Sequence, residues 1–325
     1  MRTRRIYGEP ESAVYHCMTR TVNGEFFFED REKEMMRKML WQVAGFSGVE
    51  VLAYVVMSNH LHVLVRVCGA AKEVSDVELV RRYALLYPKP TDHQPMDLAV
   101  LEEALKTNSE EGQRIRQVLR ARMGDVSEFM KTLKQRFSIW FNRSRGRYGP
   151  VWCDRFKSTV VEDDPAVLRT VAAYIDLNPV RAKLVDDPKE YRFCGYAEAL
   201  SGQGQLREAL CAMTLHDDLS KALALYRTVI FAKGVGPKRN GEGAGISDEA
   251  FREVMDAEGA LPLPVLLRQR IRYFTQGAVI GSCHFVEKHI QDWTERIGDR
   301  RRRLPKSIEG AAMCGLTSFR GLRKQ

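Results

Sequence analysis

The chain lacks a hydrophobic run long enough to cross a membrane, and the basic residues Met1–Arg5 are not followed by the apolar stretch of a signal peptide. Its seven cysteines are scattered and include no Cys-x-x-Cys pair, which argues against a disulfide framework or a cysteine-rich zinc site. A Gly-x-x-x-x-Gly-Lys nucleotide-binding loop is also missing. We therefore expect a cytoplasmic protein with reduced thiols, no membrane partner and no bound nucleotide as an energy source.

Positive charge is in excess. Lysine and arginine number 51 against 42 aspartate and glutamate residues, a formal net charge of +9. Basic side chains gain affinity for phosphate backbones by releasing condensed counterions, so the net charge points to an acidic partner. Many basic proteins merely have solvated basic faces, and charge alone therefore favours nucleic acid only modestly. A hydrophobic content of 44% in 325 residues allows one large domain or two ordinary ones.

Two β-branched, apolar runs, residues 49–57 and 61–67, meet at a polar turn and predict a β-hairpin. Side chains alternate between the two faces of a strand, so His60 and His62 point the same way and Leu61 points the other way into a core. Two imidazoles on one face make half of a metal site. With seven histidines in the chain such a pair also arises by chance, and an isolated pair is often structural.

A second polar pair lies in residues 172–182. Upstream of this segment, Pro165 suits the first turn of the helix that carries Tyr174. On that helix Tyr174 and Asn178 stand one turn apart on one face, so a phenol and an amide oxygen could join the histidines. Asn178 precedes a proline, which predicts a kink or a restart of the helix, and its side chain is occupied if it caps the new helix. Asp176 faces elsewhere and is a weaker candidate ligand.

Three motifs in this order resemble a known family. They are Asn59-His60-Leu61-His62, Gly149-Pro150-Val151-Trp152 with Arg155-Phe156-Lys157-Ser158, and Tyr174-Ile175-Asp176-Leu177-Asn178-Pro179-Val180-Arg181-Ala182. Together they are similar to the HUH-type single-strand DNA transposases, in the REP-associated tyrosine transposase branch. The resemblance covers roughly residues 10–200 and is weak or absent over about 70–125 and beyond 200.

The resemblance implies a metal-dependent transposase and nuclease that nicks and rejoins single-stranded DNA near hairpins, either REP-like sequences or transposon ends. Tyr174 would be the nucleophile and would form a 5′-phosphotyrosine, while His60, His62 and Asn178 would bind the metal ion. Two imidazoles and an amide carry no negative charge, which favours Mg²⁺ or Mn²⁺ bound together with the phosphate. Tyrosine needs such help because its hydroxyl has a pKa of about 10.

Other assignments stay open at this point. A rolling-circle replication initiator or relaxase uses the same kind of site, and a hairpin-DNA-binding regulator could retain the fold without turnover. A metal hydrolase fits less well, since its second ligand cluster would have to come from histidines in other segments, namely His93, His216, His284 and His289. By chemistry alone, rival nucleophiles are Tyr15, Tyr148, Tyr191 and Tyr196.

The order of predicted elements is a strand at 13–22, a helix after Asp30, the hairpin, a helix at 126–142 and a strand at 156–161. This order predicts an α+β, ferredoxin-like antiparallel sheet with helices on one face, leaving the other face for a ligand. His16 on the first strand is interpreted as structural. Residues 1–200 then form the HUH-type domain, with a helical insertion at about 70–125 that could cover the site, clamp DNA or merely elaborate the surface.

Residues 201–325 are expected to form a helical, DNA-binding region, with helices at 209–232, 264–274 and 282–297 and a linker at about 234–245. Phosphate contacts are expected along the strand beside the hairpin, on the helix at 126–142 and in this last region. The candidates are Arg155, Lys157, Lys131, Lys134, Arg268, Arg272 and Arg301. Trp152 and Phe156 are interpreted as packing residues, with base stacking the less favoured role. Whether the protein is a monomer or a homodimer stays open.

Overall fold

The computed structural model describes residues 12–69, 74–90, 96–107, 109–231, 274, 277–297, 304–307 and 316–319. In this part of the chain a seven-stranded sheet has the order β2-β3-β1-β4-β5-β7-β6. All neighbouring strands are antiparallel except β4 and β5. The strands are β1 (Ser12–Arg20), β2 (Val49–Val56), β3 (His60–Cys68), β4 (Lys157–Val161), β5 (Val279–Gly281), β6 (Lys306–Ser307) and β7 (Thr317–Phe319).

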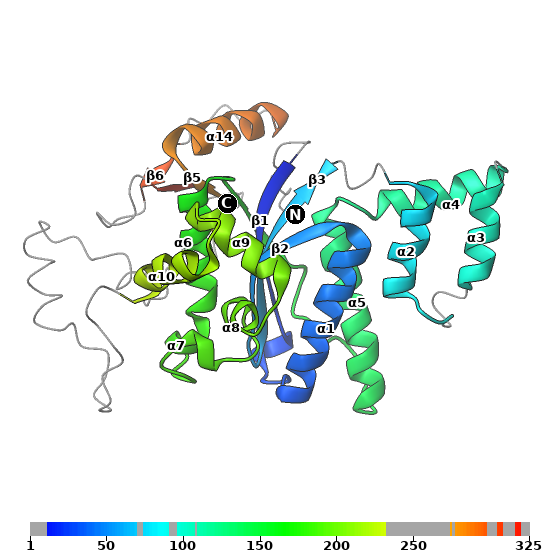
Figure 1. Ribbon diagram of the computed structural model, residues 1–325, viewed down its shortest axis with the longest axis horizontal. Coiled ribbons are helices and arrows are strands. Elements are labelled where there is room, and N and C mark those ends of the chain that lie inside the picture. Colours follow the sequence, from blue (N-terminus) through cyan, green and yellow to red (C-terminus); the bar gives the residue numbers. More distant parts are fainter. Residues whose placement is uncertain are drawn as a thin grey trace, which may run out of the picture.

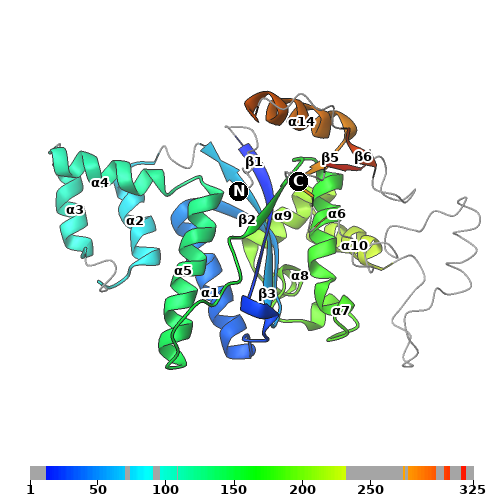
Figure 2. The ribbon, with the colours of Figure 1, turned by 180° about the vertical axis from the view of Figure 1, so that it is seen from behind.

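Helices lie on both sides of this sheet (Figures 1 and 2). The α-helices are α1 (Asp30–Ser47), α2 (Asp76–Leu86), α3 (Leu98–Lys106), α4 (Glu110–Ala121), α5 (Val126–Ser144), α6 (Pro165–Asp176), α7 (Asn178–Arg181), α8 (Gly195–Leu200), α9 (Gly204–Thr214), α10 (Leu219–Ile230) and α14 (Cys283–Ile297). Two short 3₁₀ helices are η1 (Val22–Gly24) and η3 (Pro188–Glu190). None of the helices in the described residues combines the length and hydropathy that a bilayer crossing demands.

The α+β class and the ferredoxin-like core are confirmed, with β1, α1, β2, β3, α5 and β4 in this chain order. Local signals place the helices. The Asp125 side chain accepts from the first backbone N–H groups of α5, and Asp164 does the same for α6, whose first residue is Pro165. Glu29 and Glu32 form a capping box at the start of α1.

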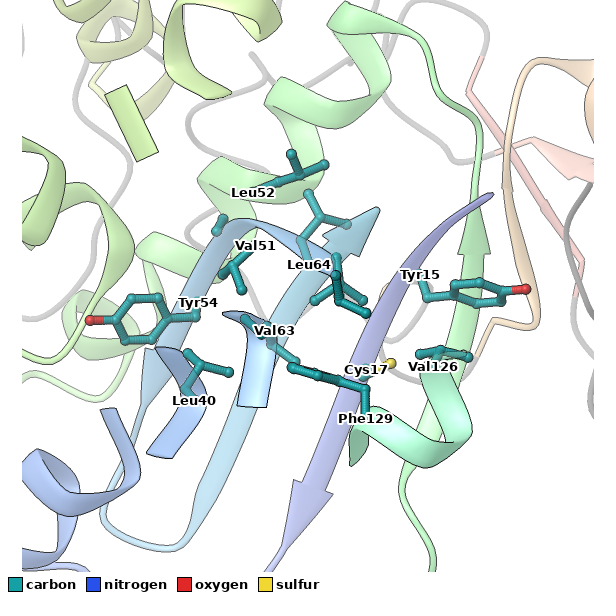
Figure 3. Close-up of a cluster of buried hydrophobic side chains, with 14 of the residues drawn as sticks. Tyr15, Cys17, Leu40, Val51, Leu52, Tyr54, Val63, Leu64, Val126 and Phe129 are labelled. Atoms are coloured by element: carbon teal, nitrogen blue, oxygen red, sulfur yellow. The ribbon is translucent and has the colours of Figure 1, made fainter. Parts of the chain in front are cut away.

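One face of the sheet packs against α1 and α5, as expected. Tyr15 and Cys17 of β1 and Val63 of β3 point to this face, where they approach Leu40 of α1 and Phe129 of α5 (Figure 3). All five side chains are buried. Burial of each large apolar side chain contributes about 1.5–3 kcal/mol, so this layer supplies much of the stability that holds the strands in register.

The opposite face is not left open. There the structure differs from the prediction, because α6, α8 and α9 pack over β2 and β3 on this side (Figure 1). The reason is visible in the strand pattern: Leu64 follows His62 on the same face and is fully buried, so this end of the face is apolar and needs a cover. In the described part of the chain, a pocket lies at the His60 end of this face.

The region beyond residue 200 is not purely helical. It contributes α9, α10 and α14, but β5, β6 and β7 extend the sheet beyond β4. The helix expected at 209–232 is divided between α9 and α10, since Leu215 adopts a left-handed conformation with φ 57°. The linker at 234–245 lies outside the described residues, as does the helix at 264–274 apart from Phe274.

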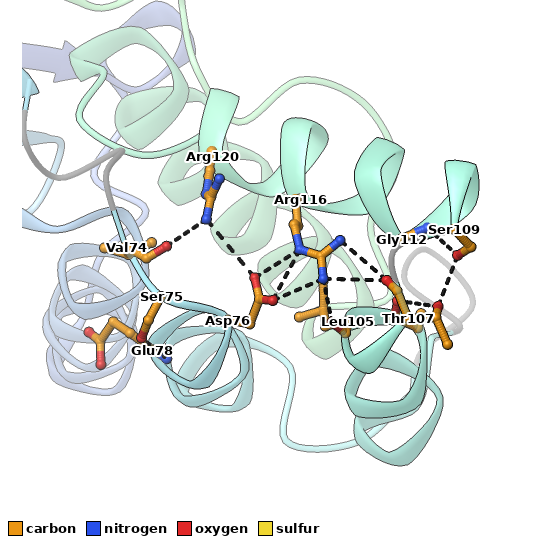
Figure 4. Close-up of polar contacts among 11 residues, drawn as sticks. Val74, Ser75, Asp76, Glu78, Leu105, Thr107, Ser109, Gly112, Arg116 and Arg120 are labelled. Carbon is orange, nitrogen blue, oxygen red and sulfur yellow. Dashed lines mark hydrogen bonds and ion pairs between the residues drawn. The ribbon is translucent and has the colours of Figure 1, made fainter.

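The insertion contains α2, α3 and α4 and follows Cys68, at the end of β3 remote from His60 (Figure 1). Arg116 of α4 holds it together, because its guanidinium donates to Asp76 at the start of α2 and to the Leu105 carbonyl at the end of α3 (Figure 4). Arg120 adds a hydrogen bond of 2.7 Å to the Val74 carbonyl. A bidentate ion pair of this kind fixes helix orientation more than it adds stability.

Candidate active site

A pocket of about 700 Å³ opens where β1, β3 and α6 meet. It collects the predicted catalytic tyrosine, all three predicted metal ligands and two of the predicted phosphate contacts. Its lining is Met18, Thr19, Arg20, Phe26, Met57, Asn59, His60, His62, Cys153, Asp154, Arg155, Lys157, Tyr174, Asn178, Arg181 and Ala182. No described residue of the insertion contributes to this lining, so the interpretation of the insertion as a cover over the site is not supported.

His60 and His62 share one face of β3, with ring centroids 5.2 Å apart. The Nδ1 atom of His60 lies 2.7 Å from Asn59 Oδ1, and Asn59 Nδ2 donates to the Gly24 carbonyl at 2.8 Å. Since the second contact assigns the NH₂ group of Asn59, its Oδ1 must accept from His60. The neutral His60 ring therefore carries its proton on Nδ1 and its lone pair on Nε2.

His16, which the sequence predicted to be structural, contacts this group from the neighbouring strand. Its Nε2 atom lies 2.9 Å from His62 Nδ1, and the two rings stack with centroids 5.1 Å apart. Burial lowers the pKa of His16 to about 4, so the ring is neutral at pH 7. The contact arises because β1 pairs with β3, a long-range pairing that no local sequence pattern reveals.

Tyr174 projects from α6 toward the two histidines. Its ring centroid lies 6.3 Å from those of both His16 and His62, in edge-on geometry. Phe274 stacks on the tyrosine ring at 4.5 Å, and the Arg181 guanidinium carbon lies 4.2 Å from the ring centroid. The side chain is thereby held in place, and Tyr174 is only 2% exposed.

Asn178 starts α7, so the restart before Pro179 occurs as predicted. Its side chain does not cap the new helix. Instead Nδ2 donates to the carbonyls of Ile175 at 2.9 Å and Tyr174 at 3.3 Å, which are among the last carbonyls of α6. Two carbonyl acceptors require the NH₂ group on that side, so the amide oxygen is on the other side of a side chain that lines the pocket.

The donors present suit a hard or borderline divalent cation. Within the described ranges, no cluster of three His, Cys, Asp or Glu side chains is placed to hold a metal ion. Among the described residues that line the pocket, the Asn178 amide oxygen is the ligand that the sequence predicted beside the two imidazoles. Imidazole nitrogen and amide oxygen without a carboxylate fit Mg²⁺ or Mn²⁺ that is also held by a phosphate.

Four cationic side chains line the pocket: Arg20, Arg155, Lys157 and Arg181. Strand pairing explains their gathering. Lys157 of β4 lies opposite Met18 of β1, and the Cys153 N–H donates to the Arg20 carbonyl at 3.0 Å, which lays residues 153–155 along the end of β1. The site is therefore strongly basic, with Asp154 as the one acidic residue among those that line it.

The other predicted DNA contacts are not in the pocket. Lys131 is exposed on α5 and pairs with Glu128 at 3.0 Å. Lys134 donates to the Asp154 carbonyl at 2.6 Å, and burial lowers the pKa of its ammonium to about 8. A contact with DNA through either lysine would be peripheral to the pocket. Arg268, Arg272 and Arg301 lie outside the described residues.

Tyr174 is also the one tyrosine that lines the pocket among the described residues. Tyr15 is buried on the opposite face of the sheet, and the hydroxyl of Tyr191 donates to the Val56 carbonyl. Tyr196 bonds Arg227, and Tyr148 is 95% exposed elsewhere. Trp152 packs on Phe28 and Phe137, in agreement with its predicted packing role.

Residues 10–82 match a family model described as "Transposase IS200 like". A solved structure of a REP-associated tyrosine transposase bound to a REP hairpin aligns with 15% identity and a TM-score of 0.39, covering 62% of this chain and 87% of that chain. Comparison with curated proteins gives no match. The matched segment contains the hairpin with His60 and His62, and over residues 10–82 the chain is similar to IS200-like transposases.

Proposed function

We propose that the protein cleaves and rejoins single-stranded DNA near hairpin sequences through a covalent Tyr174 intermediate. One observation carries the proposal. A single basic pocket collects the phenol of Tyr174, the imidazoles of His60 and His62 and the amide of Asn178, although the histidine pair lies more than a hundred positions before the other two residues. Convergence of a nucleophile, a ligand set and cations at one site is the arrangement that phosphoryl transfer needs.

The proposed step balances without an external energy source. Tyr174 Oη attacks the scissile phosphorus, a P–Oη bond forms and the P–O3′ bond breaks. The phenol proton is lost to solvent, and the departing O3′ takes up a proton to become a free 3′ hydroxyl. The 5′ phosphate stays on the tyrosine as a diester, so a second 3′ hydroxyl can reverse the reaction and join strands.

Six of the residues that line the pocket have a part in this step. His60, His62 and Asn178 would hold Mg²⁺ or Mn²⁺, which when bound polarises a phosphoryl oxygen. Arg155 and Lys157 bind the phosphates on either side of the scissile one, and Arg181 keeps the Tyr174 ring oriented. A single strand is favoured because its backbone can bend into a pocket bounded by both the sheet and α6, whereas a duplex is too stiff and wide.

The direct test is incubation with hairpin-bearing single-stranded oligonucleotides and Mn²⁺. We expect a protein–DNA adduct that survives denaturation, visible as a shifted band on a denaturing gel, together with a free 3′ hydroxyl. Chelation with EDTA should abolish the adduct, because neutral ligands alone do not activate the phosphate. The same sequence annealed to its complement should give little adduct. An adduct of equal yield in EDTA would contradict the metal-dependent mechanism.

A second candidate is a hairpin-binding regulator without turnover. The burial of Tyr174 between Phe274 and Arg181 favours it, since a nucleophile that is 2% exposed must become accessible before it can react. Tight binding of hairpin oligonucleotides with no adduct under any divalent cation would establish this role instead.

Phe26 is expected to stack a nucleobase. It is 79% exposed, and it lines both the pocket and a neighbouring recess that contains Ser58, Arg31 and Lys33. An exposed aromatic ring that lines a basic pocket suits base stacking, which contributes about 1–3 kcal/mol per base. We expect Phe26→Ala to weaken single-strand affinity roughly five- to a hundredfold, measured by fluorescence anisotropy.

The matched control for Phe26 is Val77→Ala on α2, which removes a side chain of similar exposure remote from the pocket. It should leave affinity unchanged, and Phe26→Tyr should retain most of the affinity because it keeps the ring. Equal affinities of Phe26→Ala and wild type would remove Phe26 from the DNA path.

A further inference from the structure

Each of the two paired histidines has its Nδ1 atom occupied by a side chain from another position. Asn59 Oδ1 lies 2.7 Å from Nδ1 of His60, and His16 Nε2 lies 2.9 Å from Nδ1 of His62. The two partners differ in kind, one an amide anchored to the Gly24 carbonyl and the other a buried imidazole on a neighbouring strand. Both contacts direct the Nε2 side of the ring away from the partner.

The contact at His62 is built into the sheet. His16 lies opposite Leu64 in the β1–β3 register, so it is diagonal to His62 on the same face, a separation that long and aromatic side chains can bridge. His16 is 2% exposed, and burying an imidazole costs free energy unless its nitrogens are hydrogen-bonded. An apolar side chain would fill this position at no such cost, so the imidazole needs a reason beyond packing.

We infer that His16 is a positioning residue: its Nε2 accepts a hydrogen bond from His62 Nδ1–H and so fixes the tautomer in which His62 Nε2 carries the lone pair for a divalent cation. The inference rests on the proposed function, in which His62 is a metal ligand. Partners at the far nitrogen of a ligating histidine fix ring orientation and raise its basicity. An imidazole in this role replaces the more usual carbonyl or carboxylate.

His16 also contributes to the spacing between the His62 and Tyr174 rings. His16 touches both His62 and Tyr174, since the His16 and Tyr174 centroids are 6.3 Å apart, so the three rings form one packed group. The proposed nucleophile Tyr174 and the proposed ligand His62 are thus both held in place by contacts with one residue of β1. A neutral partner also adds no charge, which keeps the site basic toward the phosphate.

The experiment compares His16→Phe and His16→Gln. Phe keeps a planar ring but no acceptor, whereas the Gln amide oxygen can reach the position of Nε2. Mn²⁺ affinity, read from the free-Mn²⁺ signal in electron paramagnetic resonance, should fall about 10- to 100-fold in His16→Phe and stay near wild type in His16→Gln. Equal affinities of His16→Phe and wild type, or equal losses in both variants, would overturn the inference.

A metal-free measurement separates this inference from the proposed function. Nitrogen-15 shifts of the His62 ring should show the Nδ1–H tautomer in wild type and His16→Gln, and a loss of that preference in His16→Phe. If wild type shows that tautomer yet binds no Mn²⁺, the metal mechanism fails and the positioning role stands; if the tautomer is the same in all three proteins, the positioning role fails. Val14→Ala, on the same face of β1 but outside the pocket lining, is the control and should change neither reading.

Discussion

Substitution of Tyr174 by phenylalanine is expected to abolish the covalent DNA adduct, with a loss of at least about a thousandfold in its rate of formation. The change removes one oxygen atom and nothing else from the packed ring. Phe274 can still stack on the new side chain, the Arg181 contact keeps an aromatic face, and the edge-on contacts with His16 and His62 remain. DNA binding should therefore stay within a factor of about three of wild type.

The readouts are adduct yield on a denaturing gel and affinity for the same oligonucleotide by anisotropy. Tyr148→Phe is the control, because Tyr148 is 95% exposed and lies outside the pocket. It should form the adduct as wild type does. A persistent adduct in Tyr174→Phe would mean that another residue is the nucleophile and that this pocket is not the catalytic site.

The second large effect concerns stability against pH and comes from Asp176, two positions after the tyrosine. This carboxyl is fully buried, accepts from the Tyr226 hydroxyl at 2.6 Å and from the Tyr196 N–H at 3.2 Å, and ties α6 to α8 and α10. Burial raises its pKa to about 7, although the two hydrogen bonds oppose the rise. The folded protein therefore holds a proton that the unfolded chain, with a carboxyl pKa of 3.8, releases.

A raised carboxyl pKa stabilises the fold at low pH. The contribution of Asp176 is fully present below about pH 4 and is lost as pH rises toward 7, where the folded state must also ionise. His16 acts in the opposite direction, because its lowered pKa of about 4 makes folding more favourable as pH rises from 4 to 6.5. Between these limits the two slopes offset each other in wild type.

In Asp176→Asn, the unfolding free energy should rise with pH as the His16 contribution alone predicts, because the opposing contribution of Asp176 is removed. We expect the difference in unfolding free energy between Asp176→Asn and wild type to shift in favour of the variant by on the order of 4 kcal/mol between pH 4 and 8. Urea unfolding at several pH values measures it, and other titrating groups cancel in the difference. His16→Gln should produce the converse difference, favouring the variant at low pH. A difference curve that is flat over this range would show that Asp176 does not titrate with the fold.

Local sequence patterns determined much of this protein. Alternation in β3 placed His60 and His62 on one face, helical spacing brought Tyr174 near Asn178, and acidic N-caps marked the starts of α5 and α6. These signals depend on residues within a few positions of one another, so periodicity and caps suffice to read them. The family resemblance suggested the roles that we propose for these residues.

What the tertiary structure decided are the contacts between strands and segments distant in the sequence. The pairing of β1 with β3 brought His16 to His62, the packing of α6 on the sheet brought Tyr174 to both, and the segment after η1 added Phe26 to the pocket lining. The packing of α6, α8 and α9 over the second face of the sheet, and the addition of β5, β6 and β7 beyond β4, are also long-range contacts. Such contacts depend on which surfaces meet when the core forms, and no short window of sequence contains both partners.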